Sequence, residues 1–260
     1  MIDRKRVREQ FAAYTRKYDS TDPKIALKIA HTYRVADHCE EIARSLGMTG
    51  EKVDFSWISG MLHDIGRFEQ VKRYGTFIDA QSVDHAEFGA DLLFGSEKLI
   101  KEYIDEESIY SELETIIREH NKLRIRESVT GKTFTFCNIL RDADKIDIFR
   151  VNVETPLEEI YNVSRDELVV SDVSDTVMEE VRKHHVIPRG TPRTPADYVI
   201  SHIALAFELV YPVSVEIAKR EGYLKQLLEF STASDKTRKA LEETRHELEE
   251  HFIETPPHIC

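Results

Sequence analysis

Long stretches of the chain contain neither glycine nor proline, and this feature constrains the fold more than any other. Only 10 Gly and 8 Pro occur among 260 residues. The segments between them are rich in Leu, Ile, Ala, Glu, Lys and Arg, which favour helices. Residues 131–136 (GKTFTF) alternate as a strand would, but they are short and run into a helical segment. The composition therefore predicts an all-α fold.

The clearest predicted helix follows Asp22. Asp22 can cap it, Pro23 suits its first position, and Gly47 can end it. The next helix is expected from Lys52 to His63, with Gly66 as its stop. Further helices are expected at 82–94, which Ser82 or Asp84 would cap, at 108–122, which would close at His120, and at 134–151.

Charge and the lack of long apolar runs exclude several classes of partner. Lys and Arg number 36 against 48 Asp and Glu, a net charge of -12, whereas proteins that bind long nucleic acids usually carry a basic face. The N-terminal residues have no apolar core of signal-peptide length, and no run approaches the roughly 18 residues of a membrane span. We expect a cytoplasmic protein with neither a membrane nor long nucleic acid as its partner.

The three cysteines are odd in number and far apart in the sequence. This spacing suggests neither a disulfide framework nor a CxxC metal site. Cys39 and Cys137 are predicted to be buried thiols, and Cys260 to lie in a tail.

Residues 58–69 (ISGMLHDIGRFE) place His63 and Asp64 side by side in an otherwise apolar run. Burying a carboxylate costs several kcal/mol unless a cation or a hydrogen-bond donor compensates. A metal ion would compensate, because His nitrogen and Asp oxygen suit Zn, Mn, Fe or Co.

Other polar residues also lie on an apolar helix face or at a helix end. His31 lies on the apolar face of its predicted helix at 100° per residue, while His85 and His120 lie at helix ends. Each has a structural alternative: His31 as a hydrogen-bonded core residue, His85 and His120 as caps or surface residues, and Asp144 as a solvated helix residue. Helical proteins build dinuclear sites from such ligands on separate helices.

The ordered set His31, His63-Asp64 and Asp144 carries a family resemblance. It lies within HTYRVADHCEEIA, GMLHDIG and LRDADKIDIFRV. This set resembles the HD-domain superfamily of metal-dependent phosphohydrolases over roughly residues 25 to 152. A lone His-Asp pair says little, but the three segments in this order are fairly specific.

The resemblance implies an HD-domain helical fold with additional C-terminal helices, and a site for two divalent ions drawn from Mn, Fe, Co, Ni, Zn and Mg. Asp64 would bridge to the second ion, and two further histidines occupy the places that dinuclear members use. The six implied ligands are His31, His63, Asp64, His85, His120 and Asp144.

The choice of Asp144 over Asp142 has support from the helical wheel. The apolar direction of residues 136–151 lies about 70° from Asp144 and about 130° from Asp142, so Asp144 is predicted to lie nearer the core. Lys145 matches a position where many family members carry a basic residue. It would meet a phosphate or act as a general acid, with a surface lysine as the alternative.

The implied reaction is hydrolysis of a small phosphate ester by a metal-bridging hydroxide, with Asp64 and Lys145 as catalytic residues. The substrate would be a nucleotide, a cyclic nucleotide or a sugar phosphate, and Arg34 or Arg67 could assist its binding. Two alternatives stay open: a mixed-valence di-iron oxygenase of the same superfamily, and a non-catalytic ligand-sensing or scaffold module. No Gly-Tyr-Pro follows the His-Asp pair, which argues against the cyclic-dinucleotide branch.

A single all-α domain is predicted over residues 1–260. It would comprise an HD metal-binding core at 22–152 and a C-terminal helical extension at 153–260 packed on that core. Within the extension, 184–199 is predicted to be a long irregular loop. The charged amphipathic helix at 236–252 would lie at the surface or in a homodimer contact.

Overall fold

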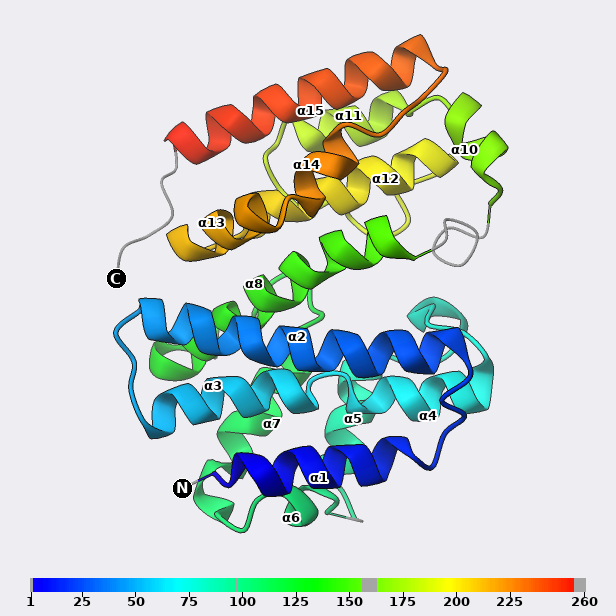
Figure 1. Ribbon diagram of the computed structural model, residues 1–260. Coiled ribbons are helices and arrows are strands. Elements are labelled where there is room, and N and C mark those ends of the chain that lie inside the picture. The colour runs from blue at the N-terminus through cyan, green and yellow to red at the C-terminus, as the bar shows by residue number, and fades with distance from the viewer. Residues whose placement is uncertain (1, 97, 156–162, 255–260) are drawn as a thin grey trace. The chain divides into compact units, whose positions relative to one another are not determined.

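The computed structural model describes residues 2–96, 98–155 and 163–254 of the chain. All regular structure within these ranges is helical, and no strand occurs among them, which confirms the predicted all-α class (Figure 1). None of the described helices is long and apolar enough to cross a membrane. The chain divides into two compact units, Met1–Asp144 and Lys145–Cys260. The predicted core boundary at residue 152 and the packing of the extension on the core stay predictions.

The first unit is built around two neighbouring helices, α2 and α3, which pack along each other (Figure 1). Two further pairs, α4 with α5 and α5 with α7, continue the packing. The elements in chain order are α1 (Arg4–Thr15), α2 (Pro23–Ser45), α3 (Glu51–Leu62), α4 (Ile65–Tyr74), η1 (Asp79–Gln81), α5 (His85–Phe94), α6 (Ile100–Tyr103), η2 (Glu107–Ile109), α7 (Tyr110–Glu119) and α8 (Gly131–Glu154), whose last residues lie beyond Asp144.

Most helix ends lie where the sequence predicted them. The Asp22 carboxylate accepts a hydrogen bond from the Lys24 amide at 2.8 Å, Pro23 opens α2, and Gly47 follows it with φ of +73°. Asp84 rather than Ser82 caps α5. Helix α1 was not predicted, and residues 131–136 are helical despite their alternation.

Gly66 does not stop a helix, which corrects the prediction. It lies in the first turn of α4, directly after the short break at residues 63–64. A Cβ at this position would lie 2.6 Å from the carbonyl oxygen of His85 and 2.7 Å from the amide nitrogen of Gly89. The missing side chain therefore allows α4 to approach the start of α5 closely.

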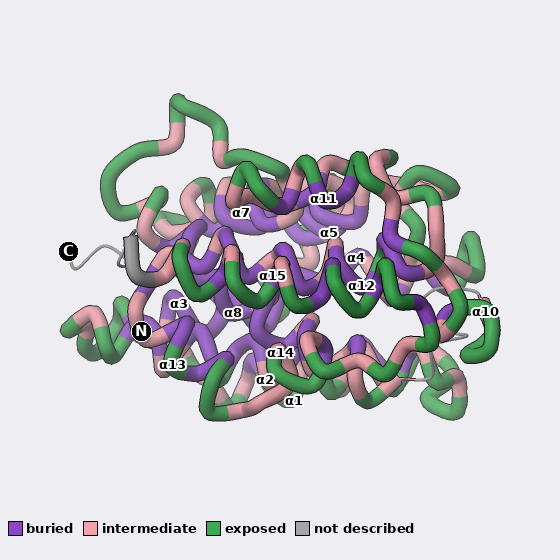
Figure 2. The backbone as a smooth tube through the Cα atoms, turned by 90° about the horizontal axis from the view of Figure 1, so that it is seen from above, coloured by how far each residue is buried: buried purple, intermediate pink, exposed green. Residues whose placement is uncertain are grey.

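Large apolar side chains fill the interior of the first unit. Val35, Trp57 and Phe68 are fully buried, and Figure 2 shows buried segments of α2 and α3. Burial of each such side chain contributes roughly 1.5–3 kcal/mol. Cys39 and Cys137 are buried free thiols, as predicted, while Cys260 lies outside the described residues.

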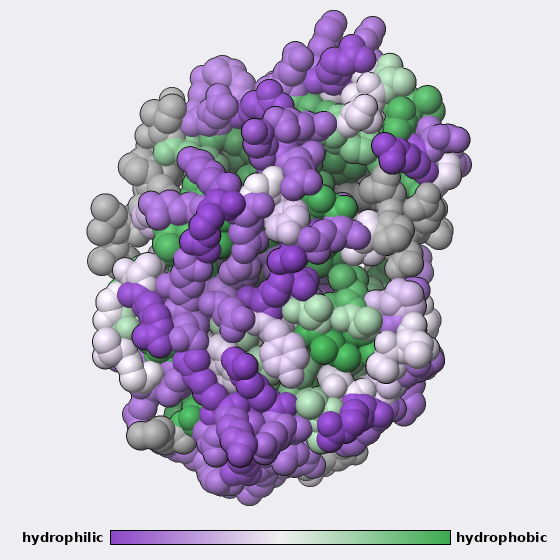
Figure 3. Space-filling model, in the orientation of Figure 1, coloured by the Kyte–Doolittle hydropathy of each residue, from purple (hydrophilic) through white to green (hydrophobic). Residues whose placement is uncertain are grey.

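The second unit contains shorter helices and one long one. They are α10 (Arg165–Val170), α11 (Asp175–Val181), α12 (Pro195–Ile203), η3 (Ala204–Glu208), α13 (Pro212–Glu221), α14 (Tyr223–Leu228) and α15 (Asp235–Glu254). The predicted irregular loop is shorter than expected, because Thr194 and Asp197 form a capping box and α12 begins at Pro195. The predicted charged helix is α15, and hydrophilic residues predominate on its visible surface (Figure 3). A homodimer contact through it stays a prediction.

Candidate metal centre

The six predicted ligands belong to the first unit, and the structure brings their side chains together. His31 lies within α2. The break between α3 and α4 supplies the adjacent pair, with His63 ending α3 and Asp64 preceding α4. The remaining three are His85 at the start of α5, His120 at the end of α7, and Asp144 on α8.

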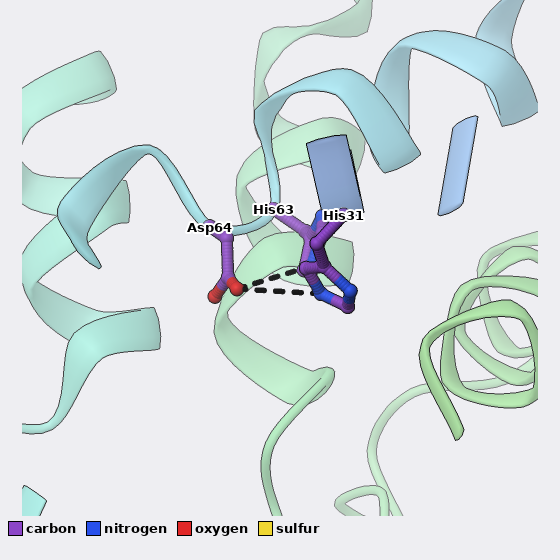
Figure 4. Close-up of side chains that lie close together, drawn as sticks. All are labelled: His31, His63 and Asp64. Atoms are coloured by element: carbon purple, nitrogen blue, oxygen red, sulfur yellow. Dashed lines mark hydrogen bonds and ion pairs between the residues drawn. The ribbon is translucent and has the colours of Figure 1, made fainter. Parts of the chain in front are cut away.

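One half of the centre surrounds the Oδ2 atom of Asp64. The Nε2 atoms of His31 and His63 lie 3.6 and 3.5 Å from this oxygen (Figure 4). The Oδ1 atom of Asp144 lies 3.2 Å from His31 Nε2 and 3.8 Å from His63 Nε2. Two imidazoles and two carboxylates therefore converge from α2, α8 and the α3–α4 junction.

The other half surrounds the second oxygen of Asp64. Its Oδ1 atom lies 3.5 Å from His85 Nε2 and 3.8 Å from His120 Nε2. Asp64 thus presents one oxygen to each pair of histidines. A carboxylate placed in this way can bridge two cations.

Hydrogen bonds on the outer ring nitrogens determine which nitrogen of three histidines points inward. Nδ1 of His63 donates to the Gly60 carbonyl at 2.7 Å, and Nδ1 of His120 donates to the Ile117 carbonyl at 2.6 Å. Nδ1 of His85 donates to the Asp79 carboxylate at 2.7 Å. Carbonyl and carboxylate oxygens can only accept a hydrogen bond, so these Nδ1 atoms carry the proton. The Nε2 atom of each ring is then unprotonated, and its lone pair can bind a metal.

The pair His85 and His120 shows why a cation fits. Burial, together with neighbouring His85 and His63, lowers the pKa of His120 to about 3, and burial also lowers the pKa of His85. Both rings are therefore neutral, and their unprotonated Nε2 atoms face each other at 3.1 Å. Two lone pairs at this distance repel each other unless a cation lies between them.

Asp64 supports the same conclusion. Its Oδ1 atom is buried and has no hydrogen-bond partner among the described residues. Burial opposes ionisation, but the positive charge of Lys28 outweighs it and holds the pKa of Asp64 well below its ordinary value. A buried, ionised carboxylate oxygen without a donor is costly, and a metal ion would satisfy it. The donor set thus fits two divalent cations of the transition-metal class.

Asp79 orients this half of the centre from outside. Its carboxylate accepts from His85 and also from Arg67 Nη1 and Gln70 Nε2, each at 3.0 Å. Burial opposes ionisation, but the hydrogen bond from His85 outweighs it and lowers the pKa of Asp79 to about 2. The His85 imidazole is consequently held by a charged partner, an arrangement that strengthens a metal ligand.

The helical wheel predicted the wrong order of burial for the two aspartates of α8, and the role of Asp144 as a metal ligand stays a prediction. Asp144 faces the histidines, but its side chain is 18% exposed, whereas Asp142 is fully buried. Asp142 is therefore the more buried of the two, although the wheel predicted that it would lie further from the core. Lys145 is buried on α8 next to Asp144, and its catalytic role stays a prediction.

Sequence reasoning missed two residues that contact the centre. Lys28 lies three residues before His31 on α2, a spacing that places both on one helical face and could have indicated it. Asp79 lies in η1, which begins fifteen residues after Asp64, and no sequence pattern relates it to His85. Arg67, expected near the site, has its Nε atom 3.5 Å from Asp64 Oδ1.

Comparison with known proteins identifies a family match over the part of the chain that holds these residues. Residues 29–148 match the family model of the HD domain. All six converging side chains lie within this range. No curated protein and no solved structure gives a significant match to the chain.

Proposed function

Because residues 29–148 of this chain form an HD domain, the domain of a superfamily of metal-dependent hydrolases, we propose that the protein is a phosphohydrolase with two divalent metals. The observation that carries the proposal is the position of the Asp64 carboxylate. Its two oxygens each face a separate pair of histidine Nε2 atoms. Two bound divalent cations would supply a water activated near neutral pH and neutralise the phosphoryl oxygens.

The chain's own residues hold the ligands in place for this chemistry. The carbonyls of Gly60 and Ile117 fix the rings of His63 and His120 at the ends of their helices. Asp79 fixes His85. The donor atoms therefore need little rearrangement when ions bind, which lowers the cost of assembling the site.

A small phosphate ester is the substrate class that the charges favour. The chain carries a net charge of -12, so a long polyanion would be repelled by most of its surface. Lys28 and Arg67 nevertheless lie within 2.6 and 3.5 Å of Asp64 oxygens. A nucleotide, a cyclic nucleotide or a sugar phosphate could reach these cations without contacting much of the acidic surface.

Phosphate release is the direct test. The purified protein would be assayed with Mn²⁺, Co²⁺ or Mg²⁺ on nucleoside mono-, di- and triphosphates, cyclic nucleotides and sugar phosphates, with a coupled phosphatase for the cyclic compounds. Activity that Asp64→Ala abolishes would support the proposal. Asp91→Ala is the matched control, because Asp91 lies on α5 with its side chain 68% exposed and pairs with Arg118.

The oxygenase alternative uses the same kind of donor set, since iron also accepts His and Asp ligands. It would be favoured by a silent phosphate panel together with iron-dependent oxygen uptake by the anaerobically prepared protein. If both assays are silent and His63→Ala leaves biological activity intact, the non-catalytic module would be favoured instead.

A further inference from the structure

Lys28 occupies a position inside the candidate metal centre. It lies on α2 one turn before His31, and its Nζ atom is 2.6 Å from Asp64 Oδ2. Its side chain is 16% exposed and that of Asp64 only 3%. A charged hydrogen bond between such poorly solvated groups is among the stronger polar contacts in a protein.

The oxygen that Lys28 contacts is one that a metal would need. The same Oδ2 atom lies 3.6 Å from His31 Nε2 and 3.5 Å from His63 Nε2. An ammonium group has no lone pair, so Lys28 cannot itself be a metal ligand. The ammonium group and a metal at this half of the centre would therefore compete for one carboxylate oxygen.

Lys28 and Arg67 differ in how firmly they are held. Nη1 of Arg67 donates to the Phe77 carbonyl at 2.7 Å and to Asp79 at 3.0 Å, which ties it to the segment between α4 and α5. Lys28 reaches Asp64 through a flexible four-carbon stem. Its Nζ atom also lies 5.5 Å from the centre of the Phe77 ring, whose face attracts cations.

We propose that Lys28 is a built-in counter-ion that neutralises Asp64 in the metal-free protein and passes to the phosphoryl oxygens of the substrate once metals are bound. Two divalent cations would more than balance the carboxylates of Asp64 and Asp144, so the ammonium group would be repelled from Oδ2 and attracted to a bound anion. The first half of this proposal rests on the metal centre alone, and the second half rests on the proposed function.

Metal titration tests the first half. Mn²⁺ would be titrated calorimetrically into the metal-free wild type and Lys28→Gln, whose amide still donates a hydrogen bond to the buried Asp64. Removing the competing charge is expected to strengthen Mn²⁺ binding about tenfold. Lys5→Gln, which removes a lysine that is 84% exposed on α1, should bind Mn²⁺ as the wild type does.

Lys28→Met provides a second neutral variant with no polar group, and the same gain in Mn²⁺ affinity is expected. Unchanged or weaker Mn²⁺ binding in the folded neutral variants would overturn the counter-ion role. Lys28→Arg keeps the charge and should show no gain.

Inorganic phosphate is the probe for the second half. Its binding to the Mn²⁺-loaded protein is expected to weaken about tenfold or more in Lys28→Gln and to be largely restored in Lys28→Arg. Equal phosphate affinity in the wild type and Lys28→Gln would overturn the transfer to substrate. Absence of hydrolysis of every substrate tested would refute the proposed function but not the counter-ion role. The Mn²⁺ titration tests that role independently of hydrolysis.

Discussion

Asp79→Asn should weaken the binding of one metal ion to the centre and leave the binding of the other unchanged. Asp79 touches the centre through His85, whose Nδ1 lies 2.7 Å from its carboxylate. Asparagine keeps the shape and an acceptor oxygen for His85, but it removes the negative charge that makes the imidazole a stronger ligand. His31 and His63 face the other oxygen of Asp64, Oδ2, and their half of the centre is expected to keep its affinity.

The size of the effect follows from the partners of Asp79. Loss of a carboxylate behind a ligating histidine typically costs 10–100-fold in metal affinity, or about 1.4–2.7 kcal/mol. Arg67 Nη1 already lies 3.0 Å from the same carboxylate and neutralises part of its charge. We therefore expect a loss nearer tenfold.

Calorimetric titration of Mn²⁺ into metal-free protein would resolve this prediction as a change in one of two binding events. Asp91→Asn is the matched control, since its side chain is exposed on the same helix as His85. Thermal melts of both variants would exclude general unfolding. Equal weakening of both events, or no change in either, would refute the role given to Asp79.

Three further predictions concern stability. Chelation of bound Mn²⁺ should lower the melting temperature of the wild type, because ligand at 100 times its Kd contributes about 2.7 kcal/mol; a similar shift in Asp64→Ala would contradict the assigned site. Gly66→Ala should lower the free energy of unfolding in urea by about 1–3 kcal/mol, because the new Cβ would meet the His85 carbonyl at 2.6 Å; wild-type stability would show that α4 and α5 can separate freely. Burial opposes ionisation of Asp84, but hydrogen bonds, of which the one from Lys122 has the largest effect, lower its pKa below the ordinary 3.8. The charge of Asp84 thus stabilises the fold above pH 3.8, and this contribution is lost as the pH falls through the pKa of Asp84 in the folded protein. Asp84→Asn should therefore be less stable at pH 7 and approach the wild type in acid, and a stability difference that is independent of pH would argue against the mechanism.

Helix ends show where local sequence was sufficient. Asp22 and Pro23 start α2, and Gly47 follows its end, because capping and left-handed backbone are properties of the residue itself. Gly66 shows the opposite case. Its role depends on the His85 carbonyl, nineteen residues later, so a local rule read it as a stop.

The candidate ligands could be named from the sequence because polar residues in apolar helical positions need a compensating partner, and because their order resembles that of a known family. The tertiary structure alone placed Lys28 on Asp64 and Asp79 on His85. It also placed Asp142 deeper than Asp144, although Asp144 faces the histidines.

The helical class and the ends of α2 were thus determined by the sequence itself, because hydrogen bonding within a helix and capping involve residues close together in the chain. The placement of the Asp64 carboxylate, with one oxygen facing each pair of histidines, was decided only by tertiary packing. Those distances join side chains from separate helices, and they depend on how closely the backbones of α2, α4 and α5 approach.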